Sequence, residues 1–446
     1  MKINKEILQI TLNKHYTLLV ILLGSVLVTI SLGPYSNGDA QVEYSAAAGI
    51  ITWGVPYMTF GNPIDQPPLG FYIDASIFKI FGLSYETGVS VITLFGLGCV
   101  FLVYEMGKVF YGKRTGLIAA ALFGLTPWHV VMSRVFLIDA QCLFFSLLCL
   151  LVGIRATRKE SLVMLFVSGT LFGLALLTKA FAVFMLIPLS LFYIYWRPKD
   201  LKHVPLGIAL FFLPAFLLHY LWYEIISGRG LFILFSHGDF ISYFPEGKVP
   251  SNFFLLSYFI QNPGVFLLGA CALSLILSIS QRKLFSKVIV SDVACFLTII
   301  FVASINMYLV LGKNLWIPYV DPAKYAYLIL PSFCCLAASL VDKFFLLHGL
   351  KNLGEQRKLI FYIAVIGLFL LMASMVMNMI ILSSYTRLNS FRFMVEGDVG
   401  FPFDRLLPVS ETPLPLVIQG LAFVAITLSL FWFNKDKLRS LHKLTP

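Results

Sequence analysis

Charged side chains are scarce in this sequence. Only 12% of its 446 residues are Asp, Glu, Lys or Arg, whereas 59% are hydrophobic, and apolar runs of seventeen residues or more recur. A soluble core could not bury so many long apolar runs, so the sequence excludes a soluble globular protein and predicts a polytopic membrane protein. The net charge of +11 then reflects membrane topology, which makes nucleic-acid binding a poor interpretation.

Several chemical motifs are also missing. All seven Cys residues fall inside apolar runs and none forms a Cys-x-x-Cys pair, so neither a disulfide framework nor a thiolate metal site is indicated. The chain has no Walker A motif, no His-Glu-x-x-His, and no Gly-x-Gly-x-x-Gly that follows a strand. It also lacks internal repeats and low-complexity segments, so residues 1–446 are interpreted as one membrane-embedded domain.

The apolar runs predict an all-α bundle of about twelve transmembrane helices. The first run has no small-residue cleavage site, so we expect it to remain as an uncleaved helix. The last run ends about a dozen residues before the C-terminus, so no soluble C-terminal domain is expected. The predicted spans are residues 16–34, 87–107, 115–132, 135–154, 161–178, 180–196, 204–223, 263–280, 289–312, 325–341, 359–382 and 413–433.

Basic residues are distributed unevenly between alternate connections. With a cytoplasmic N-terminus, 23 of the 33 Lys and Arg residues fall on the cytoplasmic side, and the outer side keeps 10 basic and 14 acidic residues. This bias predicts an integral protein of the cell membrane with both termini in the cytoplasm. The longer connections, residues 35–86, 224–262 and 383–412, all fall on the outer side, where we expect the functional residues to lie.

The first outer loop gathers acids that are scarce elsewhere. Residues 37–72 carry Asp39, Glu43 and Asp65 without a single Lys or Arg, and lead into Gln66-Pro67-Pro68-Leu69. Such a loop could present a base or metal ligands to a substrate at the lipid surface. Two segments, Gly70–Leu83 and Phe253–Ile260, are predicted to lie in the headgroup plane, with ordinary loop packing as the alternative.

Ionisable residues near the outer ends of the spans are further candidates. A charge at membrane depth costs roughly 2.5–3.5 kcal/mol, so such residues are functional candidates by default. We expect Asp139 about one turn inside the fourth span, with a structural ion pair to Arg134 as its alternative role. Lys179 lies at the turn after the fifth span, with a snorkelling lysine as the alternative, and Lys324 opens the tenth. Asp292 falls near the opposite end and is interpreted as structural.

These residues place carboxylates and cations on one face of the membrane. Cations at helix ends suit a phosphate group, and a carboxylate suits the activation of a hydroxyl or an amine. Because no nucleotide motif is present, a sugar linked to a lipid phosphate is the natural candidate for the substrate.

The order of these motifs resembles that of a known family. An acid in the first outer loop, then Pro-Pro-Leu with aromatics, then Arg134-x4-Asp139, Thr178-Lys179-Ala180 and a late basic and aromatic segment look like the GT-C superfamily of polyprenyl-phosphate-sugar glycosyltransferases. The closest branch contains the protein O-mannosyltransferases and the lipid A aminoarabinose transferase. The resemblance covers residues 30–200 well, and the rest mainly through the number of spans and the segment around Lys324.

The resemblance implies roles for individual residues. Asp39 and Asp139 would be catalytic, with Asp39 as the base or the carboxylate that orients the acceptor. The donor-binding residues would be Lys179, Lys324, Arg134, Gln66 and Tyr325. The chain departs from the family pattern because Ala40 stands where a second acid is usual and Gln66 replaces a Lys or His.

These departures leave a metal requirement open. The candidate ligands for a divalent metal ion are Asp65, Glu43 and His237, and no other cofactor is implied.

The predicted reaction is direct displacement at the anomeric carbon of a polyprenyl-phosphate sugar, with a lipid, protein or glycan acceptor. A twelve-span secondary transporter is the alternative. Against the transporter, the two halves show no matching broken helices, and the charges lie near the outer face and not at the midplane.

Overall fold

The computed structural model is a bundle of helices. It describes residues 2–34, 38–57, 64, 66–195, 204–227, 264–311, 327–349, 354–388 and 413–442, and these contain no β-strand. Its α-helices are α1 (Lys2–Ser31), α2 (Gly38–Trp53), α3 (Leu69–Phe81), α4 (Tyr85–Phe110), α5 (Lys113–Leu125), α6 (Pro127–Met132), α7 (Asp139–Lys159), α8 (Leu162–Thr178), α9 (Leu186–Tyr195), α10 (Val204–Tyr220), α12 (Val265–Ser280), α13 (Ile289–Leu311), α15 (Leu330–His348), α16 (Glu355–Leu388) and α18 (Leu414–His442). Three other helical turns are the 3-10 segments η1 (Ala180–Met185) and η7 (Tyr327–Ile329) and the π-helical η3 (Leu221–Ile226).

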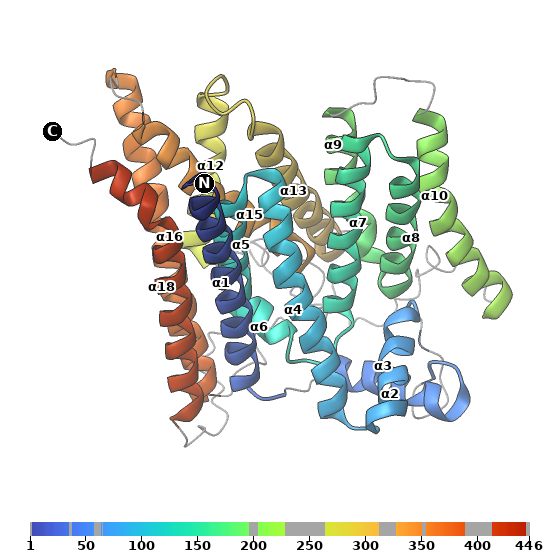
Figure 1. The fold of residues 1–446 in the computed structure, drawn as a ribbon. Helices are drawn as coiled ribbons and strands as arrows, with labels where there is room; N and C mark the ends of the chain where they lie inside the picture. Colours follow the sequence, from blue (N-terminus) through green and yellow to red (C-terminus); the bar gives the residue numbers. More distant parts are fainter. Residues whose placement is uncertain are drawn as a thin grey trace.

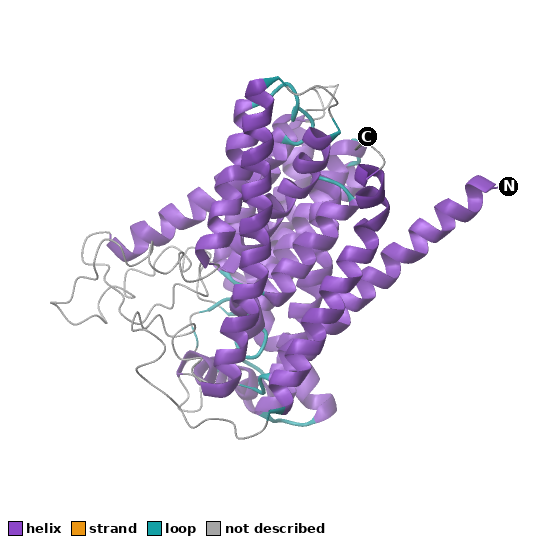
Figure 2. Cartoon of the chain, turned by 90° about the vertical axis from the view of Figure 1, so that its left-hand side faces the viewer, coloured by secondary structure: helices purple, strands orange, loops and turns teal. Residues whose placement is uncertain are grey.

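The helices of the bundle share two ends. The N-terminus of α1 and the C-terminus of α18 lie at one end, and the short helices α2 and α3 lie at the other (Figure 1). Turned by 90°, most long helices still run alongside one another (Figure 2). We call the end that carries α2 and α3 the α2–α3 end.

The predicted all-α membrane bundle is confirmed, since each of the twelve predicted spans coincides with a helix or with two short helices in succession. Among the described residues, six helices are long and apolar enough to cross a membrane, and five others are apolar but shorter. α7 and α15 are mostly buried inside the bundle, whereas α10, α16 and α18 expose most of their apolar surface, as helices facing lipid would.

Two predicted spans were wrong at their boundaries. The span at 115–132 is divided, because α5 ends at Leu125 and α6 starts with Pro127. Proline has no N–H to donate, so it is favoured in the first turn of a helix and breaks a helix interior. The span expected at 135–154 starts only at Asp139, which is therefore the first residue of α7 and does not lie one turn inside it.

The first outer loop is more helical than the sequence predicted. The segment from Gly38 to Trp53, expected as loop, forms α2, and it contains no proline and several alanines, which favour helix. The segment Gly70–Leu83, predicted to lie in the headgroup plane, forms α3, whose Ile80 and Phe81 are exposed. Ser84 then caps α4 by accepting the backbone N–H of Thr87 at 3.0 Å. The segment Phe253–Ile260 lies outside the described residues.

Helices α8 and α10 approach each other through glycines. A Cβ added at Gly169 would lie 2.0 Å from the carbonyl oxygen of Phe211, and one at Gly173 would lie 2.8 Å from Ala215 Cα. Small residues four apart let helix backbones pack closely in membranes, and this pair does so.

Gly169→Leu should force α10 away from α8. We expect the free energy of unfolding to fall by about 1–3 kcal/mol, as for other overpacked cores, measured by thermal unfolding in detergent. Gly420→Leu on α18 is the control, since a Cβ there meets nothing within 4 Å. An equal loss in both variants would contradict this packing role.

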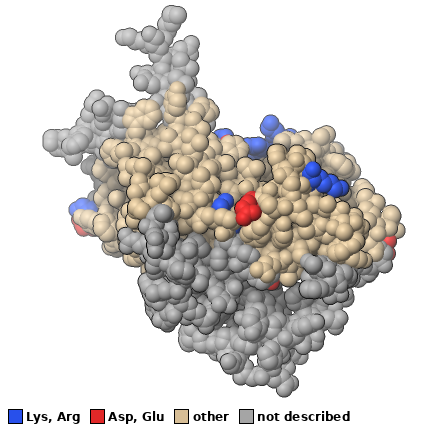
Figure 3. Space-filling view, turned by 90° about the horizontal axis from the view of Figure 1, so that it is seen from below, with Lys and Arg blue, Asp and Glu red and all other residues tan. Residues whose placement is uncertain are grey.

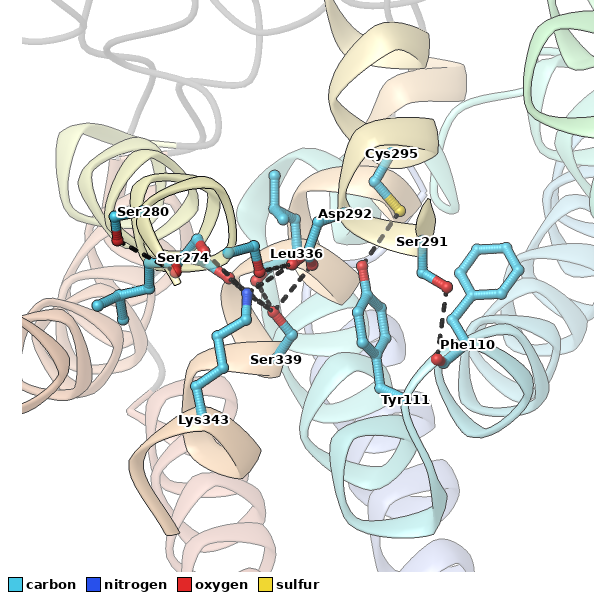
Figure 4. Close-up of polar contacts among 12 residues, drawn as sticks. Phe110, Tyr111, Ser274, Ser280, Ser291, Asp292, Cys295, Leu336, Ser339 and Lys343 are labelled. Atoms are coloured by element: carbon cyan, nitrogen blue, oxygen red, sulfur yellow. Dashed lines mark hydrogen bonds and ion pairs between the residues drawn. The ribbon is translucent and has the colours of Figure 1, made fainter. Parts of the chain in front are cut away.

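A buried ion pair joins α13 and α15 at the end away from α2 and α3. Lys343 Nζ lies 2.7 Å from Asp292 Oδ2, and it also donates to Ser274 Oγ at 2.6 Å and to Ser339 Oγ at 3.1 Å (Figure 4). Ser278 on α12 donates to the same carboxylate. The side chains of Lys343 and Asp292 are 2% and 0% exposed, so these contacts lock three helices together inside the apolar bundle.

Candidate functional site

The first turn of α7 carries a buried ion pair. Asp139 Oδ2 accepts a hydrogen bond from Lys179 Nζ at 2.6 Å, although the two residues are 40 positions apart. Asp139 is 3% exposed and Lys179 is 7% exposed. Two residues that the sequence selected separately therefore form one unit.

The helix ends favour this pair. Asp139 is the first residue of α7, where the positive end of the helix dipole stabilises a carboxylate, and Lys179 follows the last residue of α8, where the negative end stabilises a cation. Both ions lose their hydration when they are buried, which costs free energy. Good hydrogen-bond geometry and the two helix dipoles offset this cost.

Glu43 holds the residue that precedes this turn. Its side chain is fully buried, and Oε2 accepts the backbone N–H of Ile138 at 2.9 Å. The contact satisfies an amide at the N-terminus of α7 and ties α2 to it.

Asp74 and Gln141 meet beside the same turn. Both side chains are completely buried, and Gln141 Nε2 donates to Asp74 Oδ1 at 2.8 Å. Burial raises the pKa of Asp74 well above its ordinary value, the nearby Glu43 raises it further, and the hydrogen bond from Gln141 lowers it. The sequence predicted no role for this pair, because an acid within an apolar segment and a lone Gln carry no motif.

Arg134 does not take part in the ion pair. It follows α6, and its side chain donates to the carbonyl of Gly33 at 2.9 Å and to Thr93 Oγ1 at 3.2 Å. The alternative in which Arg134 pairs with Asp139 was therefore wrong, and the partner of Asp139 is Lys179. Arg134 instead links the ends of α1 and α6 to α4.

The remaining predicted residues lie at the α2–α3 end or outside the described ranges. Asp39 is in the first turn of α2 and partly buried. Gln66 is partly buried just before α3, and its Oε1 has no hydrogen-bond partner among the described residues. Predicted residues that lie outside the described part of the chain are Asp65, His237, Lys324 and Tyr325. Within the described part, no three His, Cys, Asp or Glu residues are grouped as metal ligands.

A second buried contact lies at the start of the segment that leads into α15. The hydroxyl of Tyr327 is hydrogen-bonded to His129 Nδ1, and the Tyr327 ring stacks on Phe123. The contact fixes η7 against α6. No sequence signal joins two such residues 198 positions apart.

Seen from below, the described surface consists mainly of uncharged residues, with a few acidic and basic side chains (Figure 3). Asp139 and Lys179 are buried in the protein, where electrostatic interactions are stronger than in water.

The segment that carries these residues matches a known family. Residues 65–222 match the family described as dolichyl-phosphate-mannose-protein mannosyltransferase. One similar protein is the mannosyltransferase-like YycA of Bacillus subtilis (strain 168), which is 36% identical over 140 residues. These residues are 31% of this chain and 20% of YycA. The matched segment thus spans about a fifth of the length of that relative.

Solved structures resemble the chain over nearly its whole length. The crystal structure of ArnT from Cupriavidus metallidurans in the apo state has a TM-score of 0.54 at 14% identity, covering 95% of this chain and 77% of ArnT. The chain has the GT-C glycosyltransferase fold. The apo oligosaccharyltransferase of Archaeoglobus fulgidus shares the GT-C fold with a TM-score of 0.53 at 14% identity, over 92% of this chain and 64% of that one.

The GT-C resemblance predicted from the sequence is therefore confirmed. The family match lies largely within residues 30–200, where the sequence resemblance was strongest. ArnT has also been solved bound to undecaprenyl phosphate, with a TM-score of 0.52 to this chain at 13% identity, covering 94% of this chain and 77% of ArnT.

Proposed function

We propose that this protein is a membrane glycosyltransferase that moves a sugar from a polyprenyl phosphate to an acceptor. The observation that carries the proposal is the buried Asp139–Lys179 pair at the head of α7, within a GT-C fold. Two further findings support a lipid-phosphate donor: the family description names dolichyl-phosphate-mannose, and ArnT binds undecaprenyl phosphate.

The proposed reaction is a direct displacement. The acceptor oxygen or nitrogen forms a bond to the anomeric carbon while the bond from that carbon to the phosphate oxygen breaks. Asp39 takes or orients the acceptor proton, and the polyprenyl phosphate leaves with the bonding electron pair.

Cations would stabilise the departing phosphate. Lys179 supplies positive charge whose position Asp139 fixes, and Lys324 and Arg134 supply more. Gln66 and Tyr325 would complete the donor site by hydrogen bonding.

The proposed orientation follows the distribution of basic residues. The α2–α3 end would face outward from the cell membrane, with both termini in the cytoplasm. Basic residues collect at the opposite end, for example Lys113 and Arg114 at the start of α5 and Arg158 and Lys159 at the end of α7.

The proposal is tested by transfer of label from radiolabelled polyprenyl-phosphate sugars in membranes that contain the protein. Asp39→Asn should lower transfer by about 10²–10⁴-fold, because it removes the carboxylate that accepts the proton. Glu86→Gln, which changes an exposed acid at the same end, is the control and should keep full transfer.

Two outcomes would count against these assignments. Full transfer by Asp39→Asn would remove Asp39 from the mechanism. Solute movement without consumption of any lipid donor would favour the secondary transporter. The same assay with EDTA decides the open question of a metal, whose candidate ligands are Asp65, Glu43 and His237. Loss of transfer that a divalent ion restores would show a metal requirement, and unchanged transfer would exclude one.

A further inference from the structure

Two buried oxygens beside the first turn of α7 lack hydrogen-bond partners. Gln141 Nε2 donates to Asp74 Oδ1 at 2.8 Å, yet the second oxygen of each group, Asp74 Oδ2 and Gln141 Oε1, has no partner among the described residues. Both side chains are 0% exposed, so bulk solvent does not reach either oxygen. Nearly all buried polar atoms in proteins are hydrogen-bonded, and two exceptions on one contacting pair call for an explanation.

We infer that Asp74 carries a proton on Oδ2 and donates it to Gln141 Oε1, so that the acid and the amide are joined by two hydrogen bonds in one ring. An ionised carboxylate can only accept hydrogen bonds, and Oε1 of an amide can also only accept. One proton on Asp74 Oδ2 turns that oxygen into a donor and gives Gln141 Oε1 a hydrogen bond to accept.

The surroundings of Asp74 favour the neutral acid. The ionisable group that acts on it from a neighbouring element is Glu43 on α2, which has the same sign. Gln141 on α7 is uncharged, and Lys79, the lysine of α3, is exposed. Desolvation and a like charge both oppose ionisation, in agreement with the raised pKa of this carboxyl.

The pair holds a turn that the proposed function needs. Gln141 is two residues after Asp139, so a contact from α3 fixes the turn whose first residue pairs with Lys179. The backbone of α3 lies close to the Gln141 side chain at Gly70, where an added Cβ would lie only 2.6 Å from Gln141 Oε1. Asp74 is therefore a positioning residue for Asp139, and this consequence, unlike the protonation itself, rests on the proposed function.

The inference predicts which substitution Asp74 tolerates. In Asp74→Asn, Nδ2 can donate to Gln141 Oε1 while Oδ1 still accepts from Nε2, so both hydrogen bonds persist without a proton. Asp74→Leu has a similar size but makes neither. We expect Asp74→Asn to melt no lower than the unchanged protein and to retain transfer within about threefold, whereas Asp74→Leu loses stability and about 10- to 100-fold in transfer through misplacement of Asp139.

The pH dependence has a defined sign. Because the folded-state pKa of Asp74 is raised, the folded protein holds a proton that the unfolded chain releases, and this contribution to stability is lost as the pH rises above the ordinary Asp value of 3.8 toward the folded pKa. The melting temperature of Asp74→Asn relative to the unchanged protein should therefore increase with pH.

The experiment measures thermal unfolding of the full chain in detergent across pH, with the infrared carbonyl band of protonated carboxyl groups. A band at neutral pH that disappears in Asp74→Asn and persists in the control Glu86→Gln is the expected result. A band that Asp74→Asn leaves unchanged, or an Asp74→Asn variant as unstable as Asp74→Leu, would overturn the inference. Both readouts are independent of sugar transfer, so they decide the protonation even if the proposed function fails.

Discussion

Replacing Lys179 with Met is expected to lower sugar transfer by about 10²–10³-fold and the free energy of unfolding by about 3–5 kcal/mol. The ammonium group lies 2.6 Å from Asp139 Oδ2, and both side chains are buried. Its removal leaves the Asp139 carboxylate buried without its ion-pair partner, which accounts for the loss of stability. It also removes positive charge proposed to stabilise the departing phosphate. Thermal unfolding and the donor-consumption assay measure the two effects.

A double variant separates the two effects. Asp139→Asn combined with Lys179→Met removes both charges, and replacing a whole buried pair is often neutral for stability, so the melting temperature should recover. Transfer should remain lost. Lys79→Met, at an exposed lysine of α3, is the control and should change neither quantity. Recovery of transfer in the double variant would show that the pair is only structural.

Replacing Lys343 with Met should destabilise the protein by about 3–5 kcal/mol without changing the KM for the donor. The side chain donates to Asp292 and to the two serines Ser274 and Ser339, so its loss leaves a carboxylate buried among apolar helices. Since this cluster lies at the end of the bundle opposite α2 and α3, the folded fraction should bind the donor as before. Thermal unfolding, with KM measured well below the melting temperature, tests this expectation.

The matched control is an exposed ion pair at the same end. Lys358 lies 2.6 Å from Glu355, but the two side chains are 52% and 87% exposed. Lys358→Met should cost less than about 1 kcal/mol, because water screens such a pair. Asp292→Asn added to Lys343→Met should restore much of the lost stability. Equal effects of Lys343→Met and Lys358→Met, or a changed KM in Lys343→Met, would contradict the structural role of the buried cluster.

Much of the fold was predictable because long apolar runs have one stable form in a membrane. A helix satisfies all its backbone hydrogen bonds within the segment, so each run of suitable length predicted a helix. The errors arose where local chemistry interrupts a run, as at Pro127, and where a segment with no long apolar run still folds as helix, as in α2.

The site was predictable as separate residues but not as contacts. Asp139 and Lys179 stood out because charges are scarce near spans, yet the sequence does not record that α7 and α8 bring them together. Arg134 lies five residues before Asp139, but the chain between them directs it to Gly33. Asp74 and Gln141 were missed because their importance comes from mutual burial, which depends on how α3 packs against α7.

The shortness of α5 affects how the protein meets the lipid bilayer. Thirteen residues at about 1.5 Å each span about 20 Å, whereas the hydrocarbon layer is about 30 Å thick. α5 is buried from Thr115 to Leu125 and packs against α1, α4 and α15. Its neighbours are therefore protein and not lipid, so the difference between its length and the bilayer thickness exposes no polar group to lipid. The exposed helices α16 and α18, and α10 together with η3, are among the described helices long enough to span a membrane. The shortness of α5 therefore does not by itself require the surrounding bilayer to thin.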